Sequence, residues 1–309
     1  MISTQTLELL AYLRSQDVKL SVHEGRLRYS APEGVLTPQL RAELVQHKAE
    51  IVELLGQVNS AVLAQPPIQP IPRQEPLPLS FGQQRFWFFE QLEPNNFAYN
   101  EALAFRLTGQ LNIAALEASF REIIRRHELL RTTFITIDGQ PALNIQPQLD
   151  FKLALVDFTG SNKPEAELQA FIRAEHQRPF DLAAGPLLRA YLLQLQPQEY
   201  FLLVTMHHIV TDGWSTGIFI KELTALYPYF SNSSPGPYPL PDLPIQYVDF
   251  AYWQRQWLQG SILEKQAAYW EQQLGGRLPL LHLPTDHPHP PVQSFLGATY
   301  SAQLPEPLT

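Results

Sequence analysis

The chain has 309 residues, of which 45% are hydrophobic and 17% charged, a balance typical of a globular protein with room for two domains. Its net charge of −8, with no dense run of Lys or Arg, argues against a nucleic-acid partner, and the absence of cysteine excludes disulfides, thiolate metal sites and a cysteine nucleophile. The N-terminus has no signal-peptide pattern, and no apolar run approaches the roughly 20 residues that span a bilayer. We therefore expect a cytoplasmic protein with no membrane partner.

The first 60 residues predict a small α/β domain. Thr37 followed by Pro38 is a typical helix start, because Thr caps free amide groups and Pro fits the first turn. Two alternating runs joined by a loop that ends in Gly25 predict a β-hairpin. The predicted order is a helix over 4–16, a hairpin over 18–29, a helix from 38, a break near 47–48 and a helix over 49–55.

Basic side chains are predicted to gather on one face of this hairpin. Alternation places Lys19, Arg26 and Arg28 opposite the apolar face. A hairpin edge can accept an added strand while its side chains select for charge, so this face suits an acidic peptide. The alternative, which we favour less, is a merely solvated charged face. The apolar face is predicted to carry Val18, Leu20, Val22, Leu27 and Tyr29.

Residues 5–56 resemble the tubulysin-type N-terminal docking domains of multienzyme synthetases. The matching segments are 9–18, 24–28, 36–40 and 51–55. The resemblance implies a homodimer that binds the C-terminal docking tail of the upstream synthetase through the exposed hairpin. Lys19, Arg26 and Arg28 would then favour an acidic tail. We assign residues 1–60 to this docking domain.

A proline-rich stretch follows the docking domain. Residues 64–78 contain six prolines and no glycine, which is typical of an extended, semi-rigid connector. We assign the linker to residues 61–78 and the second domain to residues 79–309.

The second domain predicts helices interleaved with strands and hairpins, so its sheet should be mixed and its fold class α+β. In the first helix, over 83–89, Phe86 and Phe89 are expected to face the core. The buried stripe of the next helix should be Leu116, Phe120, Ile123 and Ile124. Strands are predicted at 102–107, 187–194 and 200–205, a hairpin at 130–146, and helices at 113–127, 166–176, 218–226 and 262–274.

The segment Met-His-His-Ile-Val-Thr-Asp-Gly-Trp-Ser at 206–215 follows the strand predicted at 200–205. Strand ends that lead into loops commonly hold catalytic groups. Successive strand residues point to opposite faces, so His207 and His208 should not address the same ligand. This argues against a metal site built from the pair.

Four ordered segments resemble the condensation domains of nonribosomal peptide synthetases. They are 80–88, 126–134, the HHxxxDG segment 206–215, and 247–255, with a further counterpart at 283–286. The resemblance implies a chloramphenicol-acetyltransferase-like lobe with a mixed sheet and flanking helices. The family has two such lobes around a tunnel, and this chain ends before the later motifs. We therefore expect a truncated condensation domain, the N-terminal lobe, in residues 79–309.

The resemblance also implies a reaction between two carrier proteins. The upstream carrier presents an acyl or peptidyl thioester on phosphopantetheine, the downstream carrier presents an aminoacyl thioester, and the amine attacks to form an amide. His208 matches the catalytic histidine of the family, either as the base that accepts the amine proton or as a group that orients the amine or stabilises the intermediate. No cofactor is expected to bind the chain directly.

The neighbours of His208 are assigned supporting roles. His207 is expected to be structural, and Asp212 is expected to hold the loop through an ion pair with Arg131. Gly213 is expected to allow a special backbone shape or the close approach of a substrate. For His127, at a helix end, packing is favoured over an active-site role.

Within the family, the segment 206–215 looks most like domains that join two L-configured residues. Heterocyclising members have aspartates in place of the histidines, and a starter domain is not expected beside an N-terminal docking domain. Epimerising members share HHxxxDG, but Trp214-Ser215 and the opening position on the polypeptide argue against them. Two alternatives remain: a catalytically inactive docking fragment, and another acyltransferase with the HHxxxDG motif. The second leaves the docking region unexplained. The parent protein is thus expected to be an enzyme, while the truncated chain alone is expected to be inactive.

Overall fold

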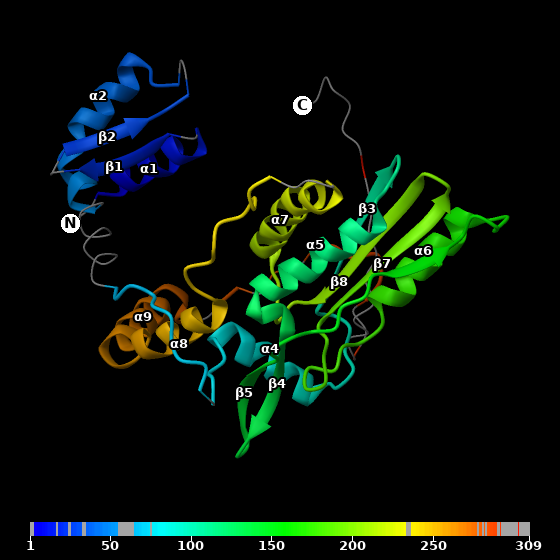
Figure 1. The fold of residues 1–309 in the computed structure, drawn as a ribbon. Helices are drawn as coiled ribbons and strands as arrows, with labels where there is room; N and C mark the ends of the chain where they lie inside the picture. The colour runs from blue at the N-terminus through cyan, green and yellow to red at the C-terminus, as the bar shows by residue number, and fades with distance from the viewer. Residues whose placement is uncertain are drawn as a thin grey trace. The chain divides into compact units, whose positions relative to one another are not determined.

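The computed structural model describes residues 3–16, 18–23, 26–32, 35–54, 65–74, 76–232 and 236–276, with a few scattered positions after 276. The chain divides into two compact units, Met1–Pro67 and Ile68–Thr309 (Figure 1). The division falls inside the proline-rich stretch.

The first unit has the predicted order of elements. Helix α1 spans Thr4–Ser15, the hairpin consists of β1 Lys19–His23 and β2 Arg26–Ser30, α2 spans Pro38–Gln46, and residues 48–54 are helical. The Thr37 hydroxyl accepts the amide hydrogen of Leu40 and caps α2, as predicted. Leu20 and Leu27 pack toward the core, and Tyr29 is paired with Leu20 in the hairpin register, so it lies on the predicted apolar face although its side chain is half-exposed. The side chain of Val22 lies outside the described residues.

A small core and one polar cluster hold this unit together. The carboxylate of Glu50 accepts hydrogen bonds from the hydroxyl of Thr6 and from the amide and hydroxyl of Ser3. These bonds lower the pKa of Glu50 to about 2. The last helix is thereby tied to the start of α1. The apolar core consists of Leu9, Leu13, Val18, Leu40, Leu44 and Ile51.

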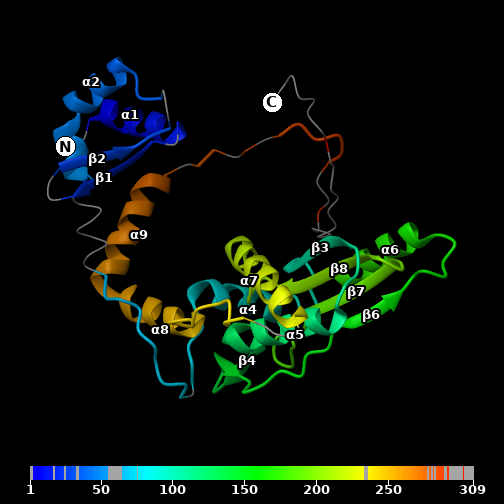
Figure 2. The ribbon, with the colours of Figure 1, turned by 45° about the horizontal axis from the view of Figure 1, so that its top comes forward.

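The second unit is built on a mixed four-stranded sheet in the order β3-β8-β7-β6 (Figure 2). Strand β8 pairs antiparallel with both β3 and β7, and β7 pairs parallel with β6. A separate hairpin is formed by β4 and β5. The bounds are β3 Asn100–Thr108, β4 Thr132–Ile137, β5 Gln140–Ile145, β6 Ala154–Asp157, β7 Leu188–Gln196 and β8 Glu199–His207.

Helices cover both faces of this sheet. Alternate residues of β7 and β8 pack against α5 and α7 on one face, whereas Leu193, Leu195 and Leu203 pack with Leu168 of α6 on the other. All four residues of the predicted α5 stripe are buried, which confirms that prediction. The bounds are α5 Ile113–Arg126, α6 Pro164–His176 and α7 Gly213–Ser231.

Four further helical segments belong to the second unit. These are α4 Phe81–Leu92, the short 3-10 helix η1 Glu128–Arg131, α8 Tyr247–Trp257 and α9 Gly260–Leu274. Phe86 of α4 is buried as predicted, but Phe89 is exposed, and α9 buries none of its residues. Within the described residues, no helix is long and apolar enough to cross a membrane.

Part of the predicted linker is held against the second unit. The amide of Ile71 donates to the carboxylate of Asp249 at 3.0 Å, and Arg73 contacts Asp249 at 2.7 Å and Glu128 at 2.8 Å. Asp249 is buried, and despite this burial its hydrogen bonds with Arg73 and the backbone lower its pKa. Leu77 then forms a β-bridge with Leu143.

Candidate active site

The segment 206–215 leaves the sheet at the end of β8. The strand ends at His207, a turn covers residues 208–210, and α7 begins at Gly213. The two histidines occupy opposite sides of this strand end, as the alternation predicted.

His207 is packed into an aromatic cage. Its side chain is 1% exposed and lies near the rings of Phe86, Tyr99 and Phe180. Its Nδ1 accepts the amide hydrogen of Ile209 at 3.0 Å. Burial, with a smaller contribution from the neighbouring charge of His208, lowers the pKa of His207 to about 4. At neutral pH His207 is therefore an uncharged packing residue that supports the turn.

His208 lies on the open side, with its side chain 36% exposed. Its amide donates to the carbonyl of Tyr99 at 2.8 Å, and its Nδ1 lies 2.7 Å from the carbonyl oxygen of Thr211. A carbonyl oxygen only accepts hydrogen bonds, so Nδ1 must carry the hydrogen. In the neutral ring, the lone pair is then at Nε2.

A carboxylate absent from the predicted site also contacts this ring. Oε1 of Glu101 lies 3.0 Å from Nδ1 of His208. Glu101 belongs to β3 and is opposite Met206 in the ladder. Only the strand register reveals this neighbour, because Glu101 is more than 100 positions from His208 in the sequence.

The exposed side of His208 borders a recess of about 230 Å³. The ring of Phe86 lies 5.0 Å from the His208 ring, and the buried Gln83 donates from Nε2 to the carbonyl of Ile209. Gln83 also forms a capping box with Ser80 at the start of α4, so this helix start supports the turn after β8. The recess is lined by Gly82, Gln83, Arg85, Phe86, Leu129, His208, Ile209, Val210, Thr211, Asp212, Ser215 and Tyr247.

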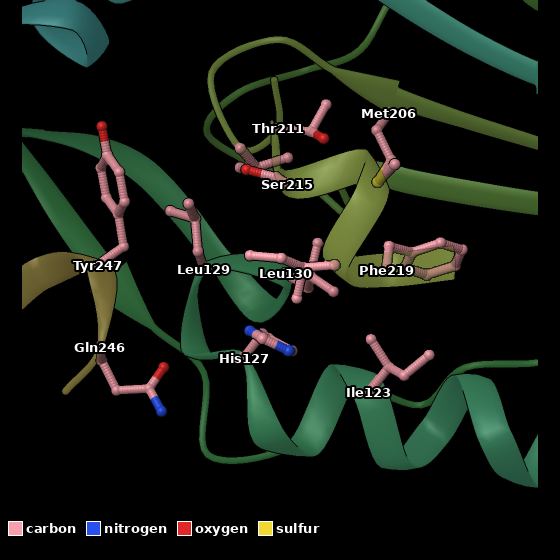
Figure 3. A pocket seen from close by; sticks show the side chains of 12 residues that line it. Ile123, His127, Leu129, Leu130, Met206, Thr211, Ser215, Phe219, Gln246 and Tyr247 are labelled. Carbon is pink, nitrogen blue, oxygen red and sulfur yellow. The ribbon is translucent and has the colours of Figure 1, made fainter. Parts of the chain in front are cut away.

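A second pocket, of about 130 Å³, adjoins this recess, and Figure 3 shows its lining. Leu129, Val210, Thr211, Ser215 and Tyr247 line both pockets. The other lining residues are mainly apolar and come from α5, β8, α7 and the start of α8. The recess at His208 has a mixed lining, and the second pocket is the more apolar of the two.

His127 contributes the imidazole in the wall of the apolar pocket (Figure 3). Its Nε2 lies 3.0 Å from Glu222, which also pairs with the buried Arg126 at 3.1 Å. Although burial alone would raise it, the pKa of Glu222 is lowered by hydrogen bonds with His127 and Arg126. His127 thus belongs to a buried polar network as well as to a pocket wall.

Asp212 caps α7. Its Oδ1 accepts hydrogen bonds from the amide of Ser215 at 2.8 Å and from the Ser215 hydroxyl at 2.6 Å, and these bonds lower the pKa of Asp212. Arg131 instead donates to the carbonyl of Gln146 and lies 3.9 Å from Glu128. Among the described ion pairs, none joins Arg131 to Asp212, so the predicted pair is wrong for this structure.

Gly213 is the first residue of α7, and a Cβ added there would meet no atom within 4 Å. Its φ is not in the left-handed region. The expected special backbone shape is therefore wrong, and close approach of a substrate remains the prediction for this glycine.

The predicted docking residues lie in the first unit. The register of β1 and β2 pairs Lys19 with Ser30, Ser21 with Arg28 and His23 with Arg26, which places positions 19, 26 and 28 on one face. Arg28 is exposed, and the side chains of Lys19 and Arg26 lie outside the described residues. The acidic tail expected to bind these three residues therefore stays a prediction. Within the described residues, no group of three or more His, Asp or Glu could hold a metal ion.

A family model described as a condensation domain matches residues 73–309. The chain belongs to the condensation domain family. The model of the TubC N-terminal docking domain matches residues 7–57 of the same chain. Both predicted resemblances are thereby confirmed.

Relatives of this condensation-domain chain are components of nonribosomal peptide synthetases. A linear gramicidin synthase protein of Brevibacillus parabrevis is 52% identical over 240 residues, which cover 77% of this chain and 3% of the relative. Bacitracin synthase 2 of Bacillus licheniformis is 31% identical over 308 residues, covering 100% of this chain and 11% of the relative. The chain thus spans a small part of these relatives.

Solved structures agree on the chloramphenicol-acetyltransferase-like fold. The X-domain in complex with OxyB from teicoplanin biosynthesis has a TM-score of 0.65 at 29% identity, covering 74% of this chain and 49% of that chain. The cyclization-docking bidomain of EpoB from Sorangium cellulosum has a TM-score of 0.63 at 23% identity, covering 91% of this chain and 55% of that chain, and supports the fold alone.

Proposed function

We propose that this chain docks to an upstream synthetase and supplies the HHxxxDG half of a site that forms an amide between two carrier-bound thioesters. In this proposal residues 1–60 are the docking domain, 61–78 the linker and 79–309 the N-terminal lobe. The observation that carries it is the geometry of His208: the Thr211 carbonyl holds the hydrogen on Nδ1, which leaves the lone pair on Nε2, and the partly exposed ring lines the open recess.

The proposed reaction joins the amine of the downstream aminoacyl thioester to the carbonyl carbon of the upstream acyl or peptidyl thioester. The C–N bond forms, Nε2 of His208 accepts a proton from the amine, and the C–S bond breaks. The departing thiolate of the upstream phosphopantetheine takes up a proton. Holding both arms in one tunnel makes the attack nearly intramolecular, which contributes several kcal/mol. We propose the base role because the hydrogen bond at Nδ1 leaves the lone pair of the neutral ring on Nε2.

Within the family, we assign the chain to domains that join two L-configured residues, because the segment 206–215 has the residues typical of that subtype. The absence of cysteine and the synthetase relatives support a cytoplasmic location.

Carrier-loaded substrates provide the test of condensation. Amide formation is measured for this chain and for a longer protein that adds the second lobe of the family. In the longer protein, His208→Ala should lower turnover about 100-fold or more, the usual range for loss of a general base. His176→Ala, at the end of α6, is the matched control and should retain turnover. Near-wild-type turnover in His208→Ala would refute the role of His208.

A docking fragment without catalysis is the second candidate function. The observation that favours it is coverage: the match with the teicoplanin X-domain structure covers 74% of this chain and 49% of that chain. Amide formation by the 309-residue chain alone would contradict this candidate.

The proposed docking partner is an acidic C-terminal tail, bound by a homodimer of the first unit. Charge reversal of Lys19, Arg26 and Arg28 to Glu should weaken binding of an acidic tail peptide by about tenfold or more at low salt. Reversal of the exposed helical residues Arg41 and Lys48 is the matched control. An unchanged affinity after hairpin reversal refutes charge selection, and a monomeric mass in solution refutes the dimer.

A further inference from the structure

The start of β3 brings a carboxylate to the ring that the proposed function uses. Glu101 is directly opposite Met206 in the antiparallel β3–β8 ladder. Paired residues share a face of the sheet, and the residue two positions further returns to that face. Glu101 and His208 are therefore diagonal neighbours, and the hydrogen bond from the His208 amide to the Tyr99 carbonyl continues the pairing to His208.

Two acceptors converge on one nitrogen of His208. Its Nδ1 lies 2.7 Å from the Thr211 carbonyl and 3.0 Å from Oε1 of Glu101. The Thr211 carbonyl accepts the Nδ1 hydrogen, which keeps the lone pair on Nε2, and the Glu101 carboxylate lies at ion-pair distance from the same nitrogen. The contacts come from the loop after β8 and from β3, so they fix the ring from two separate elements.

The carboxylate adds what the carbonyl lacks, a full negative charge. When Nε2 accepts the amine proton, the ring becomes an imidazolium, and a carboxylate 3.0 Å from Nδ1 stabilises that charge. Asp212 is the other nearby carboxylate, but its Oδ1 is engaged by Ser215 in the cap of α7. Glu101 therefore makes the direct contact.

We infer that Glu101 is a positioning residue for His208, holding the ring through an ion-pair contact at Nδ1 and stabilising the protonated ring during amide formation. The inference rests on the proposed function. With side chains 36% and 30% exposed, the pair is partly screened by water and should contribute little to folding stability. Its effect should therefore appear in turnover.

The test uses the longer protein with loaded carriers. Glu101→Gln keeps the shape of the side chain and removes its charge, so kcat should fall about tenfold while KM changes less than about twofold, the pattern of an interaction made in the transition state. Glu101→Asp retains the carboxylate and should recover part of kcat. Glu199→Gln is the matched control, since Glu199 pairs with Arg106 at the far end of the same two strands. A kcat for Glu101→Gln within about twofold of wild type overturns the inference.

A second measurement separates positioning from a general structural defect. In the His208→Ala background, Glu101→Gln should cause no further loss, because Glu101 acts through the missing ring. An independent tenfold loss in that background overturns the inference. Loss of activity in His208→Ala with normal kcat in Glu101→Gln leaves the proposed function standing and removes the role of Glu101. Full activity in His208→Ala refutes both the proposed function of His208 and the role of Glu101.

Discussion

The two sides of the β8 strand end carry the same type of side chain in opposite environments. On one side His207 is enclosed by aromatic rings, uncharged at neutral pH and bound to the backbone of the turn. On the other side His208 borders an open recess, with its ring held through Nδ1. Neighbouring identical residues can thus occupy a buried aromatic cage and an open recess, because strand alternation sends them to different surroundings.

The largest difference between the two sides is expected when a charge is introduced at each histidine. His207→Lys places an ammonium group inside the aromatic cage and should lower the free energy of unfolding by about 3–5 kcal/mol. His208→Lys, on the exposed side, should lower it by less than about 1 kcal/mol. Urea denaturation of both variants measures the difference. Equal losses would show that the two sides are equally buried in solution.

The pH dependence of stability should also distinguish the two sides. The folded-state pKa of His207 is about 4, below its ordinary value, so the unfolded chain binds more protons in the window between about 6.5 and 4. The stabilisation from keeping His207 neutral is complete above this window and is lost as pH falls through it, by about 3 kcal/mol. His207→Gln should remove this part of the slope in denaturation curves, whereas His208→Gln should retain it. If the free energy of unfolding of His207→Gln depends on pH as it does in the wild type, His207 is not the group that titrates in this window.

The residue that links the open loop to α7 should have a smaller effect. Asp212→Ala removes the helix cap and should lower the free energy of unfolding by about 1 kcal/mol. Asp212→Asn keeps a capping side chain and should remain within a few tenths of a kcal/mol of wild type. If both variants lower the free energy of unfolding equally, the negative charge of Asp212 contributes more to stability than its hydrogen bonds to Ser215.

The smallest effect is expected for the pair that the structure does not form. A double-mutant cycle of Arg131→Ala with Asp212→Ala should give a coupling energy below about 0.5 kcal/mol. The cycle of Arg126→Ala with Glu222→Ala provides the comparison, because that buried pair is in contact and should couple above this value. Strong coupling between Arg131 and Asp212 would restore the ion pair predicted from the sequence.

Local periodicity predicted the parts of this molecule that depend on neighbours in the chain. It predicted the α5 stripe, the docking hairpin and the opposite directions of His207 and His208, all of which the structure shows. It could not predict Glu101, whose contact depends on the β3–β8 register. The predicted pairing of Arg131 with Asp212 failed because such a contact also depends on the tertiary structure. Arg131 donates to the carbonyl of Gln146, and Asp212 accepts hydrogen bonds from Ser215.

The clamp at Ile71 and Arg73 has a mechanical consequence for a chain with two units. A pull along the proline-rich connector reaches the hydrogen bonds with Asp249 and Glu128 before it reaches Ser80, the cap of the helix whose Gln83 supports the turn at Ile209. Asp249 belongs to α8, so the load passes into that helix. Tyr247 of the same helix lines the His208 recess, so tension along the connector is transmitted through the clamp to one wall of that recess.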